Sequence, residues 1–160
     1  MAIEIERKFL VRSDAWRHDA DAGVRLRQGY LSRVTGTEAV RSSIRVRIGG
    51  GQATLNIKGA TLGIRRDEYE YAIPLADAEA MLTDLCLGAV IDKTRYHVEA
   101  GPHVWEIDVF AGENAGLVVA EIELNDEAEA FPHPDWLGQE VSADPRYYNV
   151  CLAERPFSRW

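Results

Sequence analysis

Charged and apolar residues alternate in short runs along most of the chain. In a β-strand, side chains two positions apart lie on the same face of the sheet. The first run places Glu4, Glu6 and Lys8 on one face and apolar neighbours such as Ile3 and Ile5 on the other. The same alternation predicts eight strands, at residues 3–11, 24–31, 42–48, 52–58, 66–73, 91–98, 104–111 and 118–125.

The charged positions of these strands mostly form doublets of a single sign. An ordinary sheet with one solvated face also alternates apolar and polar residues, so one such strand has little meaning. The repetition is more informative: Arg45 with Arg47, Lys93 with Arg95, Glu68 with Glu70, Glu106 with Asp108, and Glu121 with Glu123. It indicates a sheet whose charged face turns inward, around something that is itself charged.

Short links between most predicted strands favour antiparallel pairing, and the glycines at 49–51 are typical of a hairpin. Helices are predicted at 13–18, 74–87, 125–131 and 145–154, the last capped by Asp144. We therefore expect an α+β fold. It should be a closed eight-stranded antiparallel β-barrel, or tunnel, with a charged lumen and helices packed outside.

Composition limits the classes of partner. A chain of 160 residues with 46% hydrophobic content suits one tunnel domain, predicted at 1–155 and followed by a C-terminal tail at 156–160. Acidic residues outnumber basic ones by 26 to 18, and the net charge of −8 argues against nucleic-acid or membrane partners. Two isolated cysteines, no signal peptide and no long apolar run predict a cytoplasmic protein. The sequence leaves open whether the protein forms a homodimer.

Burying many charges is costly unless they pair, bind a metal or meet a charged ligand. Two interpretations follow. In the first, the inward charges form only a lattice of salt bridges. In the second, arginines and lysines bind the oxygens of a phosphate chain, while carboxylates hold Mg²⁺ or Mn²⁺, which prefer oxygen ligands.

An ordered series of motifs resembles the CYTH superfamily, the triphosphate tunnel metalloenzymes, over nearly the whole chain. A lone ExExK is a weak pattern, whereas the ordered set is specific. The small bacterial tripolyphosphatase-like members are the most similar. The motifs are Glu4-x-Glu6-x-Lys8, Gln28-Gly29-Tyr30-Leu31, Ile44-Arg45-Val46-Arg47, Asn56-Ile57-Lys58-Gly59, Arg66-Asp67-Glu68-Tyr69-Glu70, Asp92-Lys93-Thr94-Arg95-Tyr96, Trp105-Glu106-Ile107-Asp108, Glu121-Ile122-Glu123-Leu124 and Asp135-Trp136-Leu137-Gly138.

The resemblance implies a role for each matching residue. Tyr30 and Lys58 match a catalytic pair that activates water, although metal-bound water is an alternative base. Two divalent cations, Mg²⁺ or Mn²⁺, are implied on Glu4, Glu6, Asp108, Glu121 and Glu123. Phosphate binding is implied for Lys8, Arg27, Arg45, Arg47, Arg66, Lys93 and Arg95.

Two residues on the second predicted strand conflict with strict alternation. Alternation places Arg27 and Tyr30 on opposite faces, so both can point inward only if the strand is irregular between them. A bulge at Gly29 would achieve this.

The activity implied by the resemblance is metal-dependent hydrolysis of triphosphates, with tripolyphosphate split into pyrophosphate and phosphate. The same fold also serves thiamine triphosphatases and adenylyl cyclases, so the fold alone does not choose among them. An alternative from another class is a non-catalytic module that binds polyphosphate or nucleotides.

Overall fold

The computed structural model describes residues 2–33 and 40–160. In this part of the chain the elements are β1 (Ala2–Val11), η1 (Ala15–His18), β2 (Val24–Tyr30), β3 (Ser42–Gly49), β4 (Gln52–Gly59), β5 (Arg65–Ile73), α1 (Leu75–Asp84), β6 (Leu87–Ala100), β7 (His103–Phe110), η2 (Gly112–Asn114), β8 (Val118–Glu123), β9 (Leu137–Glu140), η3 (Pro145–Tyr147), α2 (Asn149–Glu154) and η4 (Phe157–Arg159).

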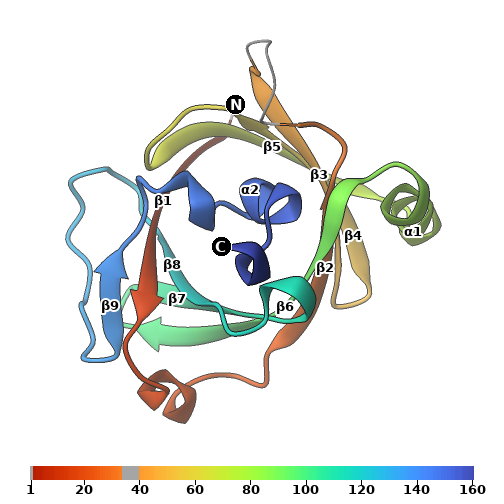
Figure 1. Ribbon diagram of the computed structural model, residues 1–160. Coiled ribbons are helices and arrows are strands. Elements are labelled where there is room, and N and C mark those ends of the chain that lie inside the picture. The colour runs from red at the N-terminus through yellow and green to blue at the C-terminus, as the bar shows by residue number, and fades with distance from the viewer. Residues whose placement is uncertain (1, 34–39) are drawn as a thin grey trace.

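The strands form a closed ring (Figure 1). Within the described residues the pairing order is β5-β4-β3-β2-β6-β7-β8-β1, and β1 also pairs with β5, which closes the barrel. Every pairing is antiparallel. The predicted eight-stranded antiparallel barrel is confirmed. A ninth strand, β9, which was not predicted, adds to β1 outside the ring.

Many apolar residues from the other face of the strands lie outside the barrel and are covered there, although both tyrosines of β5 are exposed. The largest cluster surrounds Trp105 on β7 and includes Trp16 of η1 and Trp136 beside β9. On another side of the barrel, Ala78 and Leu82 of α1 pack against the outer faces of β3 and β4. The charged face of the sheet is therefore left to the lumen, as the alternation predicts.

Two predicted helices differ in the structure. The segment 125–131 contains no helix, because side chains satisfy its backbone locally. Asp126 accepts from the backbone N–H of Ala128 at 2.8 Å, and Glu129 accepts from that of Asn125 at 2.6 Å. Such contacts compete with helical hydrogen bonds. The helix predicted at 145–154 divides into η3 and α2.

Residues 147–150, here called the closing segment, cross one end of the barrel. In Figure 1, α2 and the C-terminus lie within the outline of the ring. Two lysines of the barrel hold this segment: Lys8 Nζ donates to the carbonyl of Tyr147 at 3.3 Å, and Lys93 Nζ donates to Asn149 Oδ1 at 3.0 Å. One end of the lumen is thus closed by residues distant in sequence.

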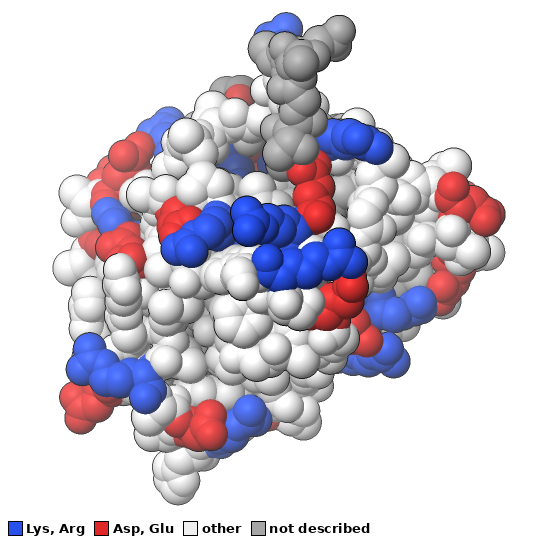
Figure 2. Space-filling view, in the orientation of Figure 1, with Lys and Arg blue, Asp and Glu red and all other residues white. Residues whose placement is uncertain are grey.

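The last residues pack against this closed end. The backbone N–H of Phe157 donates to Asn114 Oδ1 at 2.8 Å, and the Trp160 ring contacts those of Tyr147 and Phe157. Figure 2 shows Lys and Arg side chains gathered across the middle of this face. No helix in the described part of the chain has the length and apolar character needed to cross a membrane.

Candidate active site

The lumen contains a cavity of about 400 Å³. Alternate positions of the barrel strands supply most of its walls, and the closing segment supplies one end. The lining residues are Ala2, Glu4, Glu6, Lys8, Tyr30, Ser43, Arg45, Arg47, Lys58, Arg66, Glu68, Glu70, Arg95, Glu106, Glu121, Glu123, Tyr148, Asn149 and Val150.

Several basic residues of the lumen are neutralised by carboxylates. Lys58 Nζ lies 2.8 and 2.9 Å from the two oxygens of Glu4, and Arg66 Nε lies 3.2 Å from Glu4 Oε2. Lys8 Nζ lies 3.1 Å from Glu121 Oε1. A salt-bridge lattice, the first interpretation drawn from the sequence, describes this part of the lumen.

A second neutralised group is formed by Arg95, which lines the cavity, with Lys93 and Asp108, which do not. Arg95 binds both oxygens of Asp108 at 2.8 Å, and Lys93 Nζ lies 2.5 Å from Asp108 Oδ2. Arg95 also bonds to Glu106 and lies 3.2 Å from Glu121. Burial alone would raise the pKa of Asp108, but the charges of Arg95 and Lys93 hold it below its ordinary value.

Two of the predicted site residues are separated from the cavity in this group. The side chains of Lys93 and Asp108 are fully buried and do not line the cavity. Burial lowers the pKa of Lys93 to about 7, against the attraction of Asp108. Both Asp108 oxygens are already engaged by Lys93 and Arg95, so Asp108 is not available to a cation in this arrangement. Lys93 likewise faces Asp108 and Asn149 rather than the cavity.

Two arginines of β3 have no carboxylate partner among the described residues. Arg45 is buried, and its Nε has no hydrogen-bond partner. Arg47 Nε donates to the neutral amide oxygen of Gln28 at 2.9 Å. Burial, and then the charges of Arg45 and Arg95, lower the pKa of Arg47 to about 10. We call Arg45 and Arg47 the basic wall; their charge is free to meet an anion.

Two carboxylates that face each other across the β1–β8 pairing lack a cationic partner among the described residues. Glu6 and Glu123 face each other in register, and no hydrogen bond or ion pair joins either carboxylate to the described residues. Burial, and then the charges of Glu121 and Glu4, raise the pKa of Glu6 to about 8. Burial and the charge of Glu4 also raise the pKa of Glu123. We call Glu6 and Glu123 the acidic wall.

The acidic wall fits a hard divalent cation in its chemistry. Its donors are carboxylate oxygens without partners, the ligands that Mg²⁺ and Mn²⁺ prefer. Glu4 and Glu121 are near enough to raise the pKa of Glu6. Among the described residues no three His, Cys, Asp or Glu side chains already converge on one point. The carboxylates would therefore have to turn toward an ion.

Tyr30 and Lys58 line the same cavity but do not contact each other in the described structure. The Tyr30 hydroxyl accepts a hydrogen bond from Gln28 Nε2 at 3.3 Å, while Lys58 is held by Glu4. For Lys58 to act as a base, these ion pairs would have to break first.

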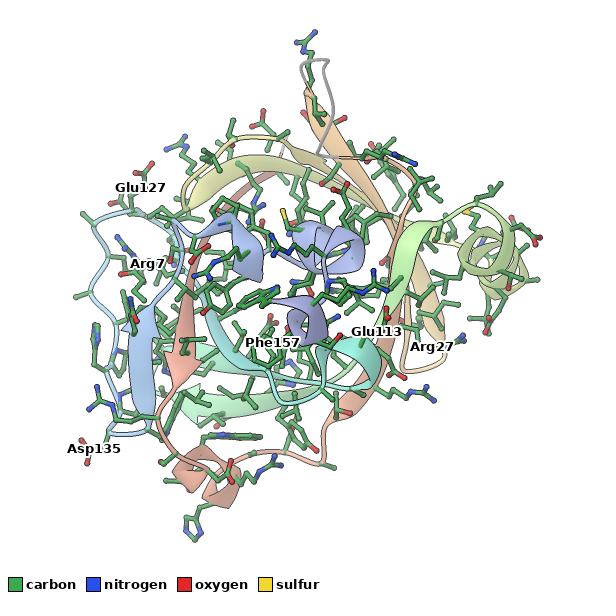
Figure 3. The ribbon with its side chains drawn as sticks, in the orientation of Figure 1. Arg7, Arg27, Glu113, Glu127, Asp135 and Phe157 are labelled. Atoms are coloured by element: carbon green, nitrogen blue, oxygen red, sulfur yellow. The ribbon has the colours of Figure 1, made fainter. Side chains whose placement is uncertain are left out.

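Arg27 lies outside the lumen, which corrects its predicted placement. Its guanidinium lies 2.5 Å from Glu79 of α1, and it sits on the outer side of β2 (Figure 3). The alternation is kept, so Tyr30 points inward and Arg27 outward. The pairing of β2 with β6 does shift register beside Gly29. The glycine is required by packing: a Cβ there would lie 2.2 Å from Cys86 Sγ.

Several residues without a predicted role take part in the site. Buried Asn56 donates to Glu68 at 3.0 Å and to Glu70 at 2.5 Å, and buried Gln28 holds Arg47. Both occupy inward positions of the alternation, so the pattern could have identified them. Tyr148 carried no such signal, because it reaches the lumen from a distant part of the chain.

Comparison with known proteins agrees with this architecture. An inorganic triphosphatase from Acetivibrio thermocellus is 45% identical over 160 residues, which covers 100% of this chain and 99% of that protein. One from Nitrosomonas europaea is 39% identical over 155 residues, covering 94% and 96%. The crystal structure of an inorganic triphosphatase has a TM-score of 0.64 at 37% identity, covering 96% and 95%.

A putative adenylate cyclase from Bacillus halodurans is similar in fold alone, with a TM-score of 0.59 at 14% identity, covering 79% of this chain and 84% of that one. The family match is more extensive, since residues 2–149 match the CYTH domain. The charged lumen, the closed antiparallel barrel and this match agree, and the chain belongs to the CYTH domain family.

Proposed function

We propose that this protein hydrolyses inorganic tripolyphosphate to pyrophosphate and phosphate inside the lumen, with the help of Mg²⁺ or Mn²⁺. Two relatives that match almost the whole chain are inorganic triphosphatases, at 45% and 39% identity. The proposal for this chain also rests on the arrangement of charges in its own cavity.

The observation that carries the proposal is the pair of walls on one cavity. The basic wall has no carboxylate partner, and the acidic wall has no cationic partner, among the described residues. Arg45 is buried and Glu6 and Arg47 are partly buried, so leaving them without partners of opposite charge is costly, whereas Glu123 is exposed. A polyanion bound together with a divalent cation neutralises both walls at once, which neither ligand does alone.

The chain's own residues would hold the substrate by charge-assisted hydrogen bonds. Arg45 and Arg47 present guanidinium groups, which can bind phosphate oxygens in a bidentate manner. Lys8 and Lys58 are engaged by Glu121 and Glu4 in the ligand-free arrangement. If Glu121 turned to a cation, Lys8 would be released and could bind a phosphate oxygen, and release from Glu4 would leave Lys58 able to act as a base.

Hydrolysis of a terminal phosphoryl group depends mainly on positioning and on stabilising charge on the phosphate oxygens. Glu6 and Glu123, with Glu4 and Glu121, would hold the cation; when bound, it supplies charge neutralisation and makes water more acidic. Lys58 remains the candidate base from this chain. Lys58→Ala should mainly lower kcat and remove any alkaline rise in its pH profile, whereas an unchanged profile would exclude Lys58 as the base.

Tripolyphosphate is proposed as the preferred substrate because most of the residues that line the cavity are charged. Phosphate contacts are common to tripolyphosphate, ATP and thiamine triphosphate, and discrimination needs contacts that the competitor lacks. Among the described lining residues, the aromatic side chains are Tyr30 and Tyr148, and each hydroxyl has a partner in the protein. We therefore expect tripolyphosphate to have the highest kcat/KM.

The decisive experiment measures phosphate release from equal concentrations of tripolyphosphate, ATP and thiamine triphosphate, with Mg²⁺ or with EDTA. We expect release from tripolyphosphate that requires the metal. Cyclic AMP with pyrophosphate as products would replace the hydrolase by a cyclase. A rise in melting temperature on ligand addition without phosphate release would indicate a binding module.

A further inference from the structure

Gln28 lies directly behind the cavity and contacts two of its lining residues. Its side chain is fully buried and does not itself line the cavity. Gln28 Oε1 accepts from Arg47 Nε at 2.9 Å, and Gln28 Nε2 donates to the Tyr30 hydroxyl at 3.3 Å. One neutral amide thus holds an arginine of the basic wall and the inward tyrosine of β2.

The neutrality of this amide matters for Arg47. Other basic residues of the lumen, such as Lys58 and Arg95, are held by carboxylates that cancel their charge. An amide oxygen orients the guanidinium through one N–H and leaves the full positive charge for an anion. A carboxylate of similar shape would also orient Arg47, but it would compete with phosphate for the same charge.

The direction of the second hydrogen bond matters for Tyr30. The amide nitrogen can only donate, so the hydroxyl oxygen serves as its acceptor. The tyrosine's own proton is then free to be donated to another acceptor in the cavity. A carboxylate at position 28 would reverse this bond, because it would accept the tyrosine proton and withhold it from a substrate.

We propose that Gln28 is a positioning residue that keeps Arg47 charged but unpaired and directs the Tyr30 proton toward the substrate. The proposal rests on the proposed function, since it assigns these two groups to the phosphate chain. It predicts that a glutamate at this position, although nearly the same shape, is worse for anion binding than an apolar residue.

The test compares Gln28→Glu and Gln28→Met with the wild type, using calorimetric binding of tripolyphosphate in EDTA, where the proposed hydrolysis does not proceed. Gln28→Glu should weaken binding by about 10-fold to 100-fold, the loss expected for a charge-assisted contact. Its melting temperature should equal or exceed that of the wild type, because Arg47 gains an ion pair. Gln28→Met should weaken binding less and should lower the melting temperature.

A matched control is Gln52→Glu, which adds the same charge at an exposed position at the start of β4. It should bind like the wild type. A purely structural role for Gln28 predicts the opposite order, with Gln28→Met the weaker binder, and that order would overturn the proposal. If the wild type binds tripolyphosphate only with a metal, the same order is judged from the KM values of the two variants with Mg²⁺.

Turnover with Mg²⁺ provides a second test should Gln28→Glu not fold. In Gln28→Met, Arg47 keeps its charge while Tyr30 loses its donor, so kcat should fall by a larger factor than KM rises. A kcat equal to that of the wild type would refute the role in directing Tyr30. If the wild type binds tripolyphosphate but releases no phosphate, the proposed function is refuted. The order of affinities of Gln28→Glu and Gln28→Met would then still test the positioning role of Gln28.

Discussion

The doublets Arg45–Arg47 on β3 and Lys93–Arg95 on β6 have the same pattern in the sequence but different surroundings in the barrel. The β6 doublet is neutralised by Asp108, with Glu106 and Glu121 also on Arg95. The β3 doublet has no carboxylate partner in the described part of the chain, and Arg47 rests on an amide. The same sequence pattern therefore has two outcomes: the β6 doublet is held in ion pairs inside the protein, and the β3 doublet remains available to a ligand.

The largest expected effect is a loss of free energy of unfolding when Arg95 of the β6 doublet is replaced. Arg95→Met would leave Asp108 and Glu121 with one cationic partner fewer in a buried site. Removing one member of a buried ion pair typically costs about 3–5 kcal/mol. We expect this loss in urea unfolding of Arg95→Met and no comparable loss in Arg45→Met. Equal losses would mean that the two doublets do not differ in the way described.

On the acidic side the same contrast separates Glu6, whose carboxylate has no partner in the described part of the chain, from Asp108, which is bound by Lys93 and Arg95. Glu6→Gln should lower kcat by about 100-fold, as for loss of one electrostatic contact at a reacting group, and should raise the Mg²⁺ concentration needed for half-maximal rate. The control Glu99→Gln removes an exposed carboxylate of β6 and should change neither quantity. Full activity of Glu6→Gln, or of the wild type in EDTA, would contradict a cation on the acidic wall.

The basic wall should matter for substrate binding more than for stability. Arg45→Ala should raise KM for tripolyphosphate by about 10-fold to 100-fold, equivalent to one hydrogen bond to a charged group, and leave kcat nearly unchanged. Its melting temperature in the absence of ligand should not fall, because the substitution leaves no carboxylate of the described residues without a cationic partner. Steady-state kinetics and thermal unfolding on one preparation check both statements. A KM equal to that of the wild type would remove Arg45 from the binding site.

The last prediction concerns pH and Lys93, whose pKa falls from 10.5 to about 7 on folding, chiefly through burial. Between these values the unfolded chain binds the proton and the folded protein does not. The contribution of Lys93 is therefore present above pH 10.5 and is lost as pH falls through about 7. The melting temperature of the wild type relative to Lys93→Met should rise from pH 7 to pH 10. No change over this range would show that Lys93 remains charged when buried, because both states would then hold the proton.

Much of the fold follows from the alternation, because period two is a local property of a strand. It predicted the eight barrel strands, although β6 is longer than expected and β9 was missed. The residues 125–131 did not form the predicted helix, since nearby carboxylates bind their backbone N–H groups. Arg27 and Tyr30 were both expected in the lumen, with an irregularity at Gly29 between them. The structure keeps the alternation instead, with Tyr30 inward and Arg27 outward.

The sequence by itself determined which side chains share the inner face, because that depends only on position along each strand. It did not determine which of these charges would be paired, since pairing depends on the stagger between strands and on separations of a few ångströms. Arg95 meets Asp108 directly in the register of β6 and β7, whereas Arg45 faces Asn56 on β4 and Tyr30 on β2. Only the tertiary structure left Arg45 and Arg47 without a carboxylate partner among the described residues and brought the closing segment across the end of the lumen (Figure 1).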